Sequence, residues 1–62
     1  MTFQDAANQL LGASHGNHSF FQAAVNHLGK TAVEEAIKAV MNGENAFGVL
    51  ASLEEAMPEI TN

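Results

Sequence analysis

The chain contains no cysteine, no tryptophan and no tyrosine, and it has a single proline among its 62 residues. The lack of cysteine excludes disulfides, by which many small secreted domains compensate for a thin core. It is also typical of a reducing compartment, so we expect a cytoplasmic protein. The sequence has neither an apolar run of about 18 residues, which would span a bilayer, nor the basic and apolar segments of a secretion signal. We therefore expect a soluble chain.

Positive charge is also scarce in this sequence. Only Lys30 and Lys38 oppose seven acidic residues, and the net charge is −5. Such a chain repels phosphate backbones and anionic lipid surfaces, so we expect no direct binding of nucleic acid and no binding to membranes. A protein partner is favoured. The charge indicates either that the partner's surface is basic or that the acidic surface mainly maintains solubility.

The length of the chain fits one small domain, residues 1–62. Apolar residues make up 47% of the chain, but eleven of them are alanines, so about eighteen larger side chains remain to fill a core. A core of this size supplies only a few kcal/mol of net stability.

The larger apolar residues recur at intervals of three and four, which is typical of amphipathic helices. This spacing predicts an all-α fold, a compact bundle or array of about four short helices. The expected ranges are residues 3–11, 20–28, 32–42 and 46–57. A side chain is expected to accept a backbone N–H at the start of each helix. These residues are Thr2 (with Asp5 in a capping box), Ser19 (with Gln22), Thr31 (with Glu34) and Asn45.

Glycine and proline are expected to end the helices. Gly12, Gly29 and Gly43 follow the first three predicted helices, and Pro58 follows the fourth. Gly48 is different because it falls inside a predicted helix, where glycine costs up to about 1 kcal/mol relative to alanine. We therefore expect another helix to cross closely at this position. Glu34 and Lys38 are also expected to form an ion pair across one helical turn.

Chemically reactive groups are few and poorly arranged for catalysis. His15 and His18 are separated by Gly16 and by an expected helix start, and His27 lies further along, whereas a zinc site needs three or four ligands held together. No oriented base or oxyanion site accompanies the serines. We expect no metal, no cofactor and no catalytic residues, so the chain is not expected to be an enzyme.

Several apolar residues lie beside the main stripe of their helix, at 100° per residue. Two explanations remain open: these flanking residues are core because the helix is covered on two sides, or they form an exposed surface that a partner covers. The candidate partner-binding residues are Phe20, Ala23, His27, Phe47, Gly48 and Ala51.

The leading hypothesis is a non-catalytic, acidic protein-interaction module that regulates, inhibits or adapts a larger protein partner. One alternative is a structural homo-oligomer, a dimer or larger, in which Phe20, Phe47 and Gly48 lie at the contact. A second alternative is an acidic mimic of nucleic acid that blocks a DNA- or RNA-binding protein.

Overall fold

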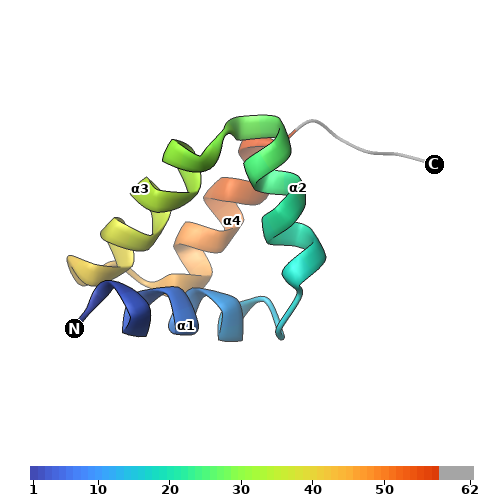
Figure 1. Ribbon diagram of the computed structural model, residues 1–62. Helices are drawn as coiled ribbons and strands as arrows, with labels where there is room; N and C mark the ends of the chain where they lie inside the picture. The colour runs from blue at the N-terminus through green and yellow to red at the C-terminus, as the bar shows by residue number, and fades with distance from the viewer. Residues whose placement is uncertain (58–62) are drawn as a thin grey trace.

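Four α-helices occupy most of residues 1–57, the part of the chain that the computed structural model describes. They are α1 (Phe3–Ala13), α2 (His18–Leu28), α3 (Lys30–Met41) and α4 (Ala46–Ala56), joined by short turns (Figure 1). The helices pack against one another, and no strand occurs within residues 1–57. The predicted all-α bundle is therefore confirmed.

The third helix organises the bundle. α3 packs against α1, α2 and α4, and α4 also packs against α1 (Figure 1). In this view α1 runs along the base, α2 and α3 rise on either side, and α4 passes behind them. The start of α1 and the end of α3 consequently lie at one end of the molecule, whereas α2 lies at the other end.

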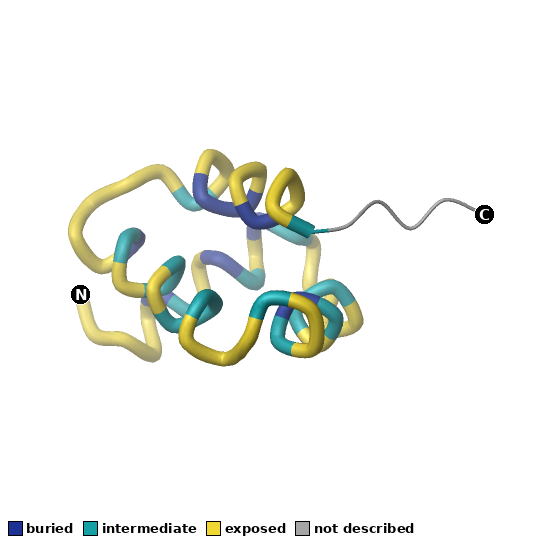
Figure 2. The backbone as a smooth tube through the Cα atoms, turned by 90° about the horizontal axis from the view of Figure 1, so that it is seen from above, coloured by how far each residue is buried: buried dark blue, intermediate teal, exposed yellow. Residues whose placement is uncertain are grey.

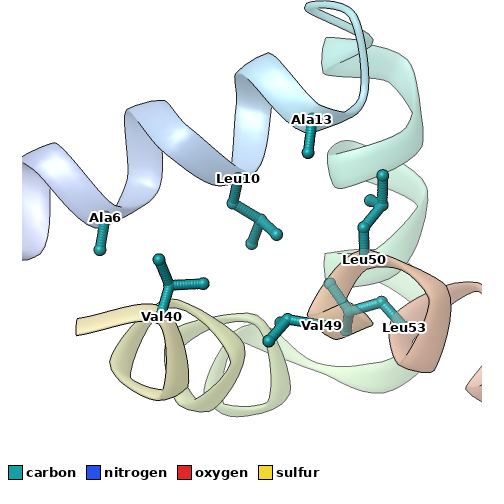
Figure 3. Packing of buried hydrophobic residues seen from close by; sticks show 7 residues of the cluster. All are labelled: Ala6, Leu10, Ala13, Val40, Val49, Leu50 and Leu53. Atoms are coloured by element: carbon teal, nitrogen blue, oxygen red, sulfur yellow. The ribbon is translucent and has the colours of Figure 1, made fainter. Parts of the chain in front are cut away.

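Leu10 and Val40 are the largest side chains that are fully buried, each with 1% of its surface exposed. Leu10 points from α1 toward α3 and α4, and Val40 lies opposite Ala6 (Figure 3). α2 adds no fully buried member to this cluster and covers it with half-buried side chains instead. The buried cluster consists of Ala6, Leu10, Ala13, Val40, Val49, Leu50 and Leu53.

Two of the predicted helix starts are confirmed. The Asp5 N–H donates to the Thr2 hydroxyl at 3.1 Å, and the Thr2 N–H donates to the Asp5 carboxylate at 3.4 Å, which completes a capping box. At the start of α4, Asn45 Oδ1 accepts the N–H groups of Phe47 at 2.8 Å and Gly48 at 3.4 Å. Both caps satisfy backbone donors that the first helical turn leaves unpaired.

The other two predicted helix starts are wrong. α2 begins at His18 rather than near residue 20, because Asn17 lies earlier than Ser19 and its Oδ1 accepts the Phe20 N–H at 3.1 Å. α3 begins at Lys30, so Thr31 is already helical and no side chain caps this helix. Gly29 alone separates α2 from α3 and reverses the chain at a φ of 95°, which only glycine adopts at low cost.

The predicted helix ends are only partly correct. α3 ends at Met41 and is followed by Gly43 at a φ of 100°, as expected. The expectation that Gly12 ends α1 is wrong. α1 continues to Ala13, whose methyl group is buried in the core cluster, and the positive φ angles fall on His15 and Gly16.

Two further expectations are wrong. Gly48 is exposed, and beyond the adjoining backbone of its own helix no described atom lies within 4 Å of the place where its Cβ would be, so no helix crosses closely there. The expected ion pair between Glu34 and Lys38 is also absent, and Lys38 Nζ lies 3.8 Å from Glu35 Oε2 instead. Glu34 is half-buried, whereas Glu35 and Lys38 are both exposed. Met57 is extended with a ψ of 144°, as suits a residue before proline, whereas Pro58 itself lies outside the described residues.

None of the helices within residues 1–57 has both the length and the apolar character that crossing a membrane requires.

Candidate partner-binding surface

The predicted partner-binding residues of α2 lie mostly against the rest of the bundle. Phe20 is half-buried and packs against the core cluster, and its ring meets that of Phe21 edge to face, with centroids 5.1 Å apart and an interplanar angle of 79°. Ala23 is half-buried as well, and His27 is exposed. Phe20 therefore contributes to the internal packing of this domain.

The predicted partner-binding residues of α4 face solvent. Phe47 has 66% of its surface exposed, and Gly48 and Ala51 are exposed too. The opposite side of the same helix carries Val49, Leu50 and Leu53, which are buried, so anchoring α4 in the core directs Phe47 outward. α2 and α4 are not among the helix pairs that pack closely, so the predicted residues of the two helices lie on separate parts of the bundle.

The large apolar side chains that stay exposed lie at the ends of three helices. Within residues 1–57, the large hydrophobic residues that remain exposed belong to the start of α1, the end of α3 and the start of α4. In Figure 1 the start of α1 and the end of α3 lie at the same end of the molecule, and a short turn of exposed residues, yellow in Figure 2, leads from the end of α3 to the start of α4. We call this set the apolar end: Met1, Phe3, Met41 and Phe47.

Three members of the apolar end were not among the predicted partner-binding residues. Phe3 and Met41 fit the spacing of the buried stripes of their helices, which predicts a core position for both. They are exposed because each lies in the terminal turn of its helix, beyond the last neighbour able to cover it. Periodicity predicts which side of a helix is buried, but it does not indicate that residues in the terminal turns of that side stay exposed.

A shallow groove of about 270 Å³ runs between α3 and α4. Its α3 side carries alanines in place of larger residues, and its charged side chains are the carboxylates of Glu35 and Glu44. The lining residues are Ala32, Glu35, Ala36, Ala39, Glu44, Val49, Ser52 and Leu53.

A second hollow of about 190 Å³ lies among α1, α2 and α3. Its walls are apolar, and the imidazole of His18 is the one titratable group that lines it. The lining residues are Ala7, Leu10, Leu11, His18, Phe21, Val33 and Ile37.

The side chains with reactive polar groups are engaged in local hydrogen bonds or dispersed over the surface. Ser14 Oγ donates to the Leu11 carbonyl at 2.6 Å, and Ser52 Oγ donates to the Gly48 carbonyl at 3.2 Å. Within residues 1–57, no charged or polar residue is buried, and no three His, Asp or Glu side chains lie close enough to share a metal ion. The features of the described surface that suit binding are its exposed apolar side chains and its carboxylates.

No protein-family model, no curated protein and no solved structure matches this chain. Its function is therefore inferred from its own surface.

Proposed function

We propose that this protein is a small non-catalytic module that binds a larger protein through its apolar end and thereby regulates, inhibits or adapts that partner. One observation carries the proposal: the exposed large hydrophobic side chains of residues 1–57 all lie at ends of α1, α3 and α4, three helices that pack against one another. Scattered exposed hydrophobic residues need no explanation, but a gathering of them is characteristic of an interaction surface.

Phe47 is the principal anchor of this surface. It exposes more of its side chain than any other large hydrophobic residue of the described chain, and burial of apolar surface yields about 25 cal/mol per Å². The backbone at Phe47 is already ordered before binding, because α4 is held by its buried side and the Asn45 cap orders its first turn. A partner with an apolar pocket would gain most from covering this ring.

A binding function agrees with the chemistry of the rest of the chain. The groove and the hollow are lined by apolar side chains with few reactive groups, and the serines described above are engaged in local hydrogen bonds. We therefore propose that the protein acts without metal or cofactor and is not an enzyme. The absence of cysteine supports a cytoplasmic location.

Affinity capture from the native cell, followed by direct binding measurement with the captured protein, tests this function. Phe47→Asp should abolish the interaction and leave the helical circular dichroism spectrum unchanged, since Phe47 is exposed. Gln22→Asp is the matched control, because it adds the same charge at an exposed position of α2. A partner that binds wild type and Phe47→Asp equally would refute the proposal. Phe20→Asp is less informative because Phe20 is half-buried and its loss would weaken the fold.

The thin core supports a second candidate, a homo-oligomer whose subunits cover one another's apolar ends. Leu10 and Val40 are the only large side chains of the described residues that are fully buried, so a second copy would add substantially to the buried area. Sedimentation over a concentration series distinguishes the candidates. A monomer at every concentration refutes self-association, whereas a dimer that Phe47→Asp dissociates supports it.

A further inference from the structure

The groove between α3 and α4 combines a narrow apolar floor with acidic groups. Ala32, Ala36 and Ala39 present only methyl groups on the α3 side, and Ser52 is the small residue that faces them from α4. Small side chains allow another backbone to approach closely, and a groove between two helices accepts the apolar side of a third helix. The shape of this surface therefore suits a helix.

The charge of the groove specifies the chemistry of that helix. The charged residues in the lining are Glu35 and Glu44, both exposed carboxylates, on a chain whose net charge is −5. Within residues 1–57, Glu44 makes no ion pair, and the contact between Glu35 and Lys38 is a long, exposed one at 3.8 Å. Such an exposed ion pair contributes little to stability, so a cation of the partner can replace Lys38 beside Glu35 at little cost.

The groove also reaches the apolar end. Glu44 belongs to the turn between α3 and α4, which joins Met41 to the start of the helix that carries Phe47. An elongated partner segment that covers Met41 and this turn is thus adjacent to the groove.

We propose that the α3–α4 groove binds an amphipathic basic helix of the partner protein. Its small and apolar side chains lie on the alanine floor, and its lysine or arginine side chains reach Glu35 and Glu44. This inference rests on the proposed binding function and names the chemistry of the partner. Phe47 does not line the groove, so the two ideas can fail independently.

The test uses a synthetic amphipathic peptide of about 18 residues, built from leucine, alanine and lysine at helical spacing. Titrated into the isotopically labelled full chain, it should shift the amide resonances of α3 and α4 that line the groove. A peptide with glutamate in place of every lysine should not bind. Equal binding of both peptides, or shifts confined to α1 and α2, would overturn the proposal.

Two pairs of variants locate the interaction. Glu35→Gln with Glu44→Gln should weaken binding about tenfold, whereas Glu54→Gln with Glu55→Gln, which changes the net charge equally outside the groove, should weaken it much less. Ser52→Phe fills the groove from an exposed position and should abolish binding. Ser19→Phe on α2 is its control, and circular dichroism shows whether each variant is folded. Equal losses within either pair would exclude the groove as the site.

The test of the groove and the test of the proposed function can give different results. If the peptide does not bind while the native partner still requires Phe47, the groove proposal fails and the function stands. If the peptide binds in the groove but Phe47→Asp leaves native binding intact, the apolar end is not the contact surface.

Discussion

Replacing Leu10 by alanine should remove a large part of the stability of this domain. Leu10 is 1% exposed and lies where α1 meets α3 and α4, so truncation leaves a cavity among side chains that cannot collapse fully (Figure 3). Buried Leu→Ala substitutions cost about 3–5 kcal/mol. At about 0.05–0.15 kcal/mol per residue, a chain of 62 residues has about 3–9 kcal/mol of total stability.

Thermal and urea denaturation followed by circular dichroism measure this loss. For a domain of this size, 1 kcal/mol corresponds to about 4–8 °C, so Leu10→Ala should lower the Tm by at least about 12 °C. At the low end of the stability range the variant is largely unfolded at room temperature. Leu10→Val, which removes a single methylene, should then still give a measurable transition that is lowered by about 1 kcal/mol.

Phe47→Ala is the matched comparison, because it removes a larger side chain from a residue that is 66% exposed. The loss should stay below about 1 kcal/mol, since most of the ring is already in contact with water. Equal losses for Leu10→Ala and Phe47→Ala would refute the assignment of Leu10 to the core and of Phe47 to the binding surface.

Three further predictions follow from local geometry. Asn17→Ala should cost about 1 kcal/mol in a urea titration, because Asn17 caps α2, whereas Ser19→Ala should change stability by no more than a few tenths of a kcal/mol. Gly29→Ala should cost about 1–3 kcal/mol because φ is 95° there, whereas Gly48→Ala should raise stability by up to about 1 kcal/mol, since a methyl group at this helical position meets open space. Neither zinc nor a chelator should shift the Tm, because no three potential ligands converge in residues 1–57, and a shift of several degrees with zinc would contradict this.

The helix caps show most clearly which features the local sequence determines and which depend on the tertiary structure. Thr2 and Asn45 cap the helices that the sequence assigns to them, because each bond joins groups only two or three residues apart. Ser19 and Thr31 have the same capping chemistry, and yet they lie inside helices. Asn17 and Ser19 could each cap α2, and local chemistry alone does not decide between them. At α3, the tight turn at Gly29 starts the helix before Thr31 can cap it.

The candidate binding residues show the same division. The sequence identified Phe20 and Phe47 as apolar residues beside the main stripes, and it could not distinguish core from surface for either of them. Which flank is covered depends on the directions in which the helices cross, and that is a property of the whole bundle. The structure covers Phe20 and leaves Phe47 exposed.

Periodicity and capping chemistry were sufficient for the number, the type and the approximate limits of the helices, because these depend on contacts within one or two turns of the chain. Which large apolar side chains stay exposed at the ends of α1, α3 and α4, and the groove that brings Ala32 and Glu35 of α3 beside Ser52 and Leu53 of α4, depend on residues far apart in the sequence. Tertiary packing alone decided those surfaces, because only the mutual arrangement of the helices determines which of their remaining faces adjoin.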